Sequence, residues 1–442
     1  MTFNRLLVEI WSPLPPLASG IADYVNEQLA TLDQFLDLSL VVEDPARIDP
    51  SLGVRYQVVS PENYNPRALR VYHLGNSPLH GFIYREAIRT PGVVVLHEWN
   101  LHELILGLGV RSHDFSGYRA QMRRQHGEGG AIAAQTVASA LGGRHWPGAF
   151  PLNLEILERT LGVVCLSPQT SARVAARRPA GLLLQLDHHA LLVAHAGTRD
   201  EARRRLSLPE KARLIVAPGL GTAAKALASS RAAIAEVRRR MDDVLLVTVG
   251  GGAQGNGDGT PPDFERQLGR VDLETLGDWL VAADVVVALR FPSRGETSGV
   301  LMRACAAGRA SIVSSGSAAD EDLPEGVVAR VNPGPSETAE LAALLEFLLR
   351  DHAARERLER LALALAAQRQ VEPLARRLVT FLEGVARARE ETEKALVAQE
   401  AAVSRLHPLV RSHIESAAWS LGLNQLPENV YRKLSGLGGQ RP

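Results

Sequence analysis

Short apolar runs alternate along this chain with longer segments in which apolar residues recur at the spacing of a helix. Such runs are typical of buried parallel strands, and the spaced segments are typical of the helices that connect them. The first half of the chain contains the runs 6–11, 38–42, 56–59, 71–74, 93–96, 163–166 and 182–186, and the second half contains 213–217, 243–249, 285–289 and 310–313. The pattern predicts an α/β fold of two Rossmann-like domains that face a cleft.

Composition changes in the segment 198–210, which is rich in Arg and Glu and lies between the predicted strands of the first half of the chain and those of the second half. A chain of 442 residues is too long for one core and fits two domains of ordinary size with an extension. We therefore predict a first Rossmann-like domain over 1–197, a second over 198–380 and a C-terminal helical extension over 381–442. The segments 335–367 and 371–388, in which Glu and Arg alternate, are also predicted to be helical.

The charge balance removes one class of partner. Lys and Arg together number 49, as do Asp and Glu, so net charge gives no reason to expect nucleic acid. The two cysteines, Cys165 and Cys305, lie in apolar runs and are expected to be buried thiols in a reducing compartment. The first residues carry charges where a signal peptide needs an apolar core, and no apolar stretch reaches the length of a membrane span. We expect a cytoplasmic protein, with peripheral membrane contact left open.

The loop 291–299 joins a predicted buried strand to a predicted helix at 300–307. In an open parallel sheet, ligands bind outside the carboxyl ends of the strands, where this loop would lie. With Thr297 or Ser298 as the helix cap, the N–H groups of the first turn would suit a phosphate. Glu296 has two interpretations: its carboxylate accepts hydrogen bonds from neutral hydroxyls, as on a sugar, or it caps its own helix. Spacing alone does not decide between them.

His97 follows the predicted strand 93–96, so its imidazole could hydrogen-bond a substrate hydroxyl or phosphate at the carboxyl end of that strand. Together with Glu98 and His102 it could also suggest a metal site. The second His comes five residues after the first, however, and does not match the His-Glu-x-x-His pattern. We predict no metal here and interpret His102 as a satisfied core or surface histidine.

Three further candidate residues lie at the starts of two predicted helices. Ser19 and Gly20 end a Pro-rich loop before the helix 21–36, where Gly20 either makes a tight turn or lets a ligand approach the backbone. Lys225 lies in the first turn of the helix predicted over 223–240, where the helix dipole disfavours a cation unless an anion is close. From the sequence alone, a solvated surface lysine is the favoured interpretation of Lys225.

Three blocks carry a resemblance: Glu-Thr-Ser-Gly at 296–299 followed by Leu-Met-Arg-Ala-Cys-Ala-Ala-Gly at 301–308, Pro-Leu-Pro-Pro-x-x-Ser-Gly at 13–20, and the run from 72–80 through 95–98. In these blocks the chain resembles family 4 glycosyltransferases, which are retaining enzymes with the GT-B fold. The resemblance covers roughly residues 5–375. It implies a role in carbohydrate biosynthesis: metal-independent transfer of a hexosyl-type sugar from a nucleotide diphosphate sugar, with no cofactor. The acceptor would be a hydroxyl of a glycan, a lipid or a small molecule.

The same resemblance implies roles for positions that match the family's motifs. Glu296 would contact the donor sugar, and His97 would lie near it. The backbone at Thr297, Ser298 and Gly299 and the side chain of Lys225 would hold the donor diphosphate, the backbone at Arg270 and Val271 would hold the base, and Ser19 and Gly20 would line the acceptor side. In GT-B enzymes the last helices return to the first domain, which is one interpretation of the extension. An arm that joins a partner or a second copy into an oligomer is the other.

At two positions the chain departs from the family's pattern. Ala304 stands where the family has a second Glu that contacts the nucleotide ribose, and Gly219 stands where many members have an Arg. These departures motivate a second hypothesis, a catalytically degraded scaffold or partner subunit. An epimerase or synthase on the same two domains is a third. A NAD-dependent oxidoreductase is disfavoured, because neither Gly loop reads Gly-x-Gly-x-x-Gly followed by an acid about 20 residues on.

Overall fold

The chain folds into two compact units, each built around one parallel sheet. The computed structural model describes residues 5–111, 115–138, 146–178, 181–195, 197–218, 227–250, 262–293 and 295–404. The first unit is formed by the segments 1–166 and 170–185 and by the chain from 376 onward, and the second by 167–169 and 186–375. Each unit is described by itself below.

The first unit contains a seven-stranded sheet in the order β3-β2-β1-β4-β5-β6-β7, and every described pair in it is parallel. Its strands are β1 Leu6–Trp11, β2 Leu36–Val41, β3 Gln57–Val59, β4 Leu69–Leu74, β5 Val93–Leu96, β6 Gly162–Cys165 and β7 Leu182–Gln185. All residues of β4 and β5 are buried, as expected for strands that helices cover on both faces.

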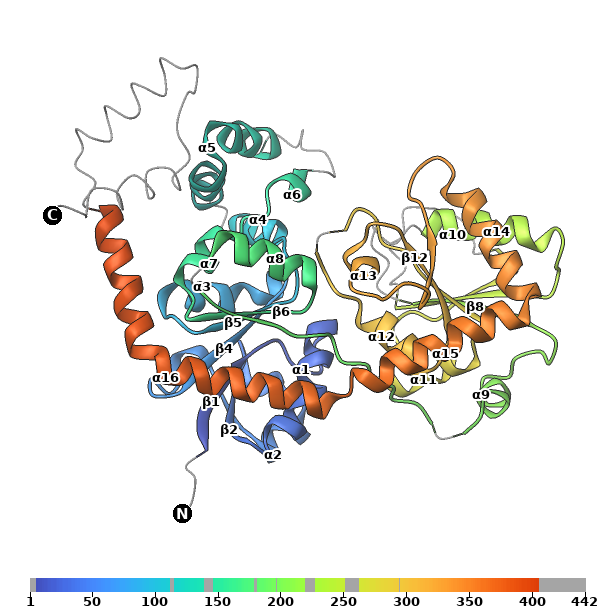
Figure 1. Cartoon of the computed structure of the whole chain (residues 1–442), viewed down its shortest axis with the longest axis horizontal. Helices are drawn as coiled ribbons and strands as arrows, with labels where there is room; N and C mark the ends of the chain where they lie inside the picture. The colour runs from blue at the N-terminus through green and yellow to red at the C-terminus, as the bar shows by residue number, and fades with distance from the viewer. Residues whose placement is uncertain are drawn as a thin grey trace. The chain divides into compact units, whose positions relative to one another are not determined.

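Helices flank this sheet (Figure 1). They are α1 Gly20–Leu32, α2 Pro50–Arg55, α3 Gly81–Arg89, α4 His102–Arg111, α5 Ser116–Ala138, α6 Trp146–Ala149, α7 Leu154–Arg159 and α8 Pro168–Arg177, with single 3-10 turns at Pro45–Arg47, Pro61–Asn63 and Pro78–His80. Because β2 and β4 lie on opposite sides of β1, the strand order reverses at β1, and the crevice expected at such a point lies at the carboxyl ends of β1 and β4.

The second unit contains a six-stranded parallel sheet in the order β10-β9-β8-β11-β12-β13. Its strands are β8 Arg213–Pro218, β9 Val244–Val249, β10 Glu265–Gln267, β11 Val285–Ala288, β12 Ala310–Ser314 and β13 Ala329–Val331. Its helices are α9 Arg199–Arg205, α10 Leu227–Arg238, α11 Leu273–Ala282, α12 Gly299–Ala306, α13 Ala318–Glu321, α14 Glu337–Arg350 and α15 His352–Gln368. The strand order reverses between β8 and β11, so α12 begins beside the reversal point.

The predicted strands are present, with bounds that shift by at most two residues. The segment predicted to be helical over 335–367 is helical but is divided into two helices, because Asp351 ends α14 and caps α15, whose Ala354 N–H donates to the Asp351 carboxylate at 2.9 Å. An Asp at an N-cap competes with the helix interior for backbone N–H groups, and here that local bond divides the helical pattern.

The last described helix, α16 Val371–Ser404, packs on the first unit from residue 376 onward. Arg377 donates from Nη2 to the carbonyl of Gln185 at 2.8 Å. A Cβ at Gly162 of β6 would lie 3.0 Å from Phe381 and 3.1 Å from Val385, so the helix approaches this strand closely. The segment before α9 packs on the second unit, where His195 Nδ1 lies 2.8 Å from Asp278.

Candidate functional site

The turn before α12 places Glu296 in a buried position beside the start of the helix. Ser298 is the N-cap, and its Oγ accepts a hydrogen bond from the N–H of Leu301 at 3.3 Å. The alternative in which Glu296 caps its own helix is therefore wrong. Instead the Glu296 carboxylate, which is 6% exposed with the rest of its residue, accepts from Arg290 Nη1 at 2.9 Å. The N–H groups of Gly299 and Val300 have no acceptor among the described residues.

Arg290 is a site residue that sequence reasoning missed. It stands just beyond β11, and its own N–H donates to Ser314 Oγ at the end of β12 at 3.0 Å. The charge of Arg290 changes the electrostatics of the loop. Without a partner, the Glu296 carboxylate would repel an anion at the N-terminus of α12, whereas the ion pair of Glu296 with Arg290 repels an anion much less. The signal available in the sequence was an Arg directly after the strand, six residues before Glu296.

His188 lies against the first residue of α12. A Cβ on Gly299 would meet His188 Nε2 at 3.3 Å, so the absence of a side chain at 299 lets the imidazole approach the helix start. Burial lowers the pKa of His188 to about 3, and the neighbouring His189, Arg303 and Arg369 add to that effect. The neutral ring donates from Nδ1 to the carbonyl of His189 at 2.8 Å. Among the described residues, no cluster of three or more His, Cys, Asp or Glu could hold a metal ion.

The position of the family's second Glu faces the core. Ala304 is fully buried in an apolar cluster that includes Leu280, Ala283 and Val286. The preceding residue, Arg303, is also buried and donates from Nη1 to the carbonyl of Leu191 at 3.2 Å. A carboxylate at 304 would therefore point into apolar side chains rather than toward a ligand.

His97 lies at the carboxyl end of β5 in the first unit and is 6% exposed. Its Nε2 is 3.0 Å from Nδ1 of His73, the residue before the last of β4. Tyr24 of α1 packs edge-on against the His97 ring, with 5.0 Å between centroids. This contact brings the start of α1, with Ser19 and Gly20, to the same end of the sheet as His97.

His73 and His80 were not predicted as neighbours of His97. Burial lowers the pKa of His73 to about 3, and His80 adds to the effect. His80 donates from Nδ1 to the carbonyl of His73 at 2.9 Å, and burial lowers its pKa to about 4. Both imidazoles are therefore neutral at physiological pH, so His97 Nε2 faces a neutral partner whose ring position is fixed by the strand.

Gly20 is the first residue of α1 and follows its cap, Ser19, whose Oγ accepts from Ile21 N at 3.2 Å. A Cβ at Gly20 would meet nothing within 4 Å, and its φ lies outside the left-handed region. The fold itself therefore does not need glycine at this position.

His102 is a satisfied core histidine, as predicted. It is 1% exposed, its Nδ1 lies 2.8 Å from the carbonyl of Phe150, and its Nε2 lies 3.0 Å from the hydroxyl of Tyr118. Both ring nitrogens thus have partners in the protein.

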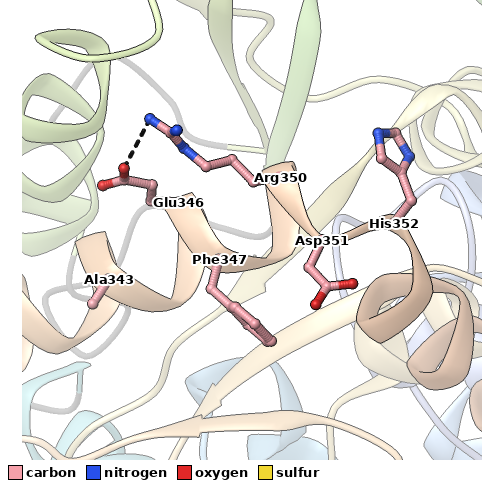
Figure 2. A pocket seen from close by; sticks show the side chains of 6 residues that line it. All are labelled: Ala343, Glu346, Phe347, Arg350, Asp351 and His352. Atoms are coloured by element: carbon pink, nitrogen blue, oxygen red, sulfur yellow. Dashed lines mark ion pairs between the residues drawn. The ribbon is translucent and has the colours of Figure 1, made fainter.

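Of the remaining predicted residues, Arg270 is exposed and Val271 packs against the apolar cluster around α11, just before the helix cap Asp272. Lys225 and Gly219 lie outside the described residues. A surface hollow at the junction of α14 and α15 contains none of the predicted residues (Figure 2). It is lined by Ala343, Glu346, Phe347, Arg350, Asp351 and His352.

Solved structures resemble this chain over most of its length. Sucrose-phosphate synthase from Thermosynechococcus elongatus matches with a TM-score of 0.61 at 17% identity, over 87% of this chain and 100% of that one. WaaG, a glycosyltransferase involved in lipopolysaccharide biosynthesis, matches with 0.56 at 11%, over 86% and 100%. HepE from Anabaena, in complex with UDP and glucose, matches with 0.57 at 14%, over 86% and 100%.

No protein-family model and no curated protein matches the sequence. Among the described residues, no helix combines the length and the apolar character that crossing a membrane requires. At identities this low, structural likeness establishes architecture and not activity. The two parallel sheets with their flanking helices, and the solved structures that they resemble, show that this chain has the GT-B fold.

Proposed function

We propose that this protein is a retaining glycosyltransferase that moves a hexosyl group from a nucleotide diphosphate sugar to an acceptor hydroxyl. The GT-B fold and the resemblance of the 296–308 block to family 4 enzymes support this proposal. The observation that carries it is the ion pair of the buried Glu296 with the half-buried Arg290 beside the N-terminus of α12. A carboxylate held in place next to an anion-binding helix end suits a ligand that has both hydroxyls and phosphates.

In this proposal the charge that grows on the leaving diphosphate is stabilised by the N–H groups of Gly299 and Val300 and by the side chain of Lys225. Glu296 accepts hydrogen bonds from sugar hydroxyls, and His97 orients the sugar from the first unit. A donor phosphate oxygen takes the proton of the acceptor hydroxyl, so the reaction needs neither a protein base nor a metal ion. Of the proteins whose structures resemble this chain, WaaG is a glycosyltransferase and HepE has been solved in complex with UDP and glucose.

The first test is a thermal-shift screen against a panel of nucleotide sugars. A ligand selective for the folded protein raises the melting temperature, so the matching donor identifies itself without knowledge of the acceptor. Nucleotide release is then measured with that donor for the wild type, for Glu296→Ala and for the exposed control Glu325→Ala. We expect Glu296→Ala to lose about 100-fold or more in turnover and the control to lose nothing. Unchanged turnover in Glu296→Ala at an unchanged melting temperature would reject the role of Glu296.

The second candidate is a scaffold or partner subunit that has lost catalysis. The buried Ala304 favours it, because the position at which the family contacts the nucleotide ribose is part of the apolar core here. Calorimetry separates the two candidates: a scaffold of this kind binds no nucleotide sugar, whereas the enzyme binds its donor.

A further inference from the structure

Two arginines of α8 converge on one tryptophan ring in the first unit. The guanidinium carbon of Arg173 lies 5.6 Å from the centre of the Trp99 ring, and that of Arg177 lies 4.8 Å from it. The two arginines are four residues apart, so they project from the same face of the helix. Like charges at this spacing destabilise a helix unless another contact compensates them.

No carboxylate among the described residues forms an ion pair with either arginine. The charge of Glu158 raises the pKa of Arg177, but the Glu158 carboxylate forms its ion pair with Arg124, whose Nη2 lies 3.2 Å away. Burial lowers the pKa of Arg177, and the charge of Arg173 lowers it further. The Trp99 ring attracts both cations through its π face but carries no net charge. The positive charges of Arg173 and Arg177 are therefore compensated only in part.

The site is held in place by hydrogen bonds. Arg177 donates from Nη1 to the side-chain oxygen of Asn153 at 2.8 Å, and Asn153 donates from Nδ2 to the carbonyl of Trp99 at 2.5 Å. Trp99 itself is 8% exposed, so the ring beneath the guanidinium groups is packed into the first unit. Arg173 is exposed and open to solvent.

A buried nitrogen lies close by. His126 Nε2 has no hydrogen-bond partner among the described residues, and its pKa is lowered to about 4, mainly by burial and then by Arg177 and His102. A buried polar atom without a partner costs stability, and a neutral imidazole beside an arginine can donate to an oxyanion. Trp99 also follows His97 by two residues, so Trp99 belongs to the loop that follows β5 at the end of the strand where His97 lies.

We propose that Arg173 and Arg177, stacked on Trp99, bind a phosphate group of a small soluble molecule. Two guanidinium groups present parallel N–H donors that match the geometry of phosphate oxygens. If the proposed function holds, on which this last step rests, that phosphate belongs to the acceptor, since the site lies in the unit expected to face the acceptor. The substrate class is then a phosphorylated acceptor.

Binding of inorganic phosphate, in the absence of any sugar donor, tests the site directly. Phosphate is titrated into the full-length protein at constant ionic strength, with chloride as the reference anion, and is followed by tryptophan fluorescence and by calorimetry. We expect saturable binding with a change in fluorescence. Trp99→Phe should abolish the fluorescence change, and Arg173→Gln should weaken binding about 10-fold. Arg89→Gln, which removes an exposed charge at the end of α3, is the matched control and should bind as the wild type does.

Equal phosphate affinity in Arg173→Gln and Arg89→Gln would overturn the proposal, as would the absence of binding to the wild type. Arg173 is exposed, so its variant should fold even if Arg177→Gln does not. Vesicles containing phosphatidylglycerol form a second arm: binding to vesicles without binding to glucose 6-phosphate or inorganic phosphate would identify a membrane contact instead and reject the soluble ligand. Phosphate binding in a protein that transfers no sugar would leave the site standing and reject the proposed function.

Discussion

The carboxylate of Glu296 lies 2.9 Å from Nη1 of Arg290, and only 8% of the Glu296 side chain is exposed. A buried carboxylate is costly unless it is paired, and a fixed partner also restricts its orientation. Arg290 is therefore expected to act as a positioning residue for Glu296, without contacting the sugar itself.

Substitution of Arg290 should lower sugar transfer through Glu296. We expect Arg290→Gln to reduce kcat about 10- to 100-fold, with a smaller change in KM for the donor, because a misplaced carboxylate loses interactions made in the transition state. Arg290→Lys keeps the charge without the planar fork and should recover part of the loss. Arg239→Gln removes a charge that is 70% exposed and serves as the control. Wild-type kinetics in Arg290→Gln would show that Glu296 needs no partner to act.

Two glycines near the end of β1 and β4 should respond in opposite ways to alanine. A Cβ at Gly75 would lie 2.3 Å from Ile21 Cδ1 and 3.1 Å from His80 Nε2, whereas one at Gly20 meets nothing within 4 Å. Gly75→Ala should lower the free energy of unfolding by about 1–3 kcal/mol, as overpacking does. Gly20→Ala should leave the melting temperature unchanged and raise KM for a substrate that approaches the backbone of α1. If Gly20→Ala melts as early as Gly75→Ala, the tight-turn interpretation of Gly20 gains support instead.

Acid should destabilise the first unit through His80. Burial lowers the pKa of His80 in the folded state to about 4, below its ordinary value of 6.5, so the unfolded chain binds a proton first as the pH falls. The stability that depends on a neutral His80 is present above pH 6.5 and is lost toward pH 4. Between pH 7 and pH 5 this loss amounts to about 2 kcal/mol.

Asparagine can replace the His80 donor without titrating. Its Nδ2 can still donate to the carbonyl of His73, so His80→Asn should reduce the fall in unfolding free energy between pH 7 and pH 5 by about 2 kcal/mol in urea titrations. The exposed His352→Asn is the control and should keep the wild-type dependence on pH. Identical pH dependence in His80→Asn and the wild type would mean that other groups cause the acid effect.

The sequence predicts most strands of the two sheets but few of the side-chain partners of the candidate residues. Buried strands such as β5 and β11 show as uninterrupted apolar runs, because both of their faces are covered. The short strands β10 and β13 at the sheet edges contain charged residues and have no such run, so they were not predicted. Asp351, which divides α14 from α15, was visible as a capping residue but lay inside a continuous helical pattern.

The partners of the candidate residues depend on pairing that local patterns do not encode. His73 meets His97 because β4 and β5 pair in parallel with His73 opposite Val95, a register set by the whole sheet. Arg290 is placed by a bond from its backbone to Ser314 on the neighbouring strand β12. Both relationships join residues whose sequence neighbours give no sign of the contact, and tertiary structure alone brings them together.

Ala304 offers the sharpest contrast between the resemblance and the structure. The resemblance implies that a Glu at this position would contact the nucleotide ribose, so Ala304→Glu should strengthen donor binding. The structure predicts the opposite, because Ala304 is fully buried among Leu280, Ala283 and Val286, where a carboxylate finds no partner and no space. We expect Ala304→Glu to lower the free energy of unfolding by about 2–4 kcal/mol and to leave donor affinity unimproved.

The variant Ala304→Gln separates overpacking from charge burial, because glutamine has the size of glutamate without the charge. Ala304→Gln should lower the free energy of unfolding less than Ala304→Glu does at pH 7. At pH 4, where the carboxyl group is protonated, the two variants should lower it by about the same amount. Tighter donor binding by Ala304→Glu at a wild-type melting temperature would show that side chains at 304 reach the ligand and that this face of α12 is not core.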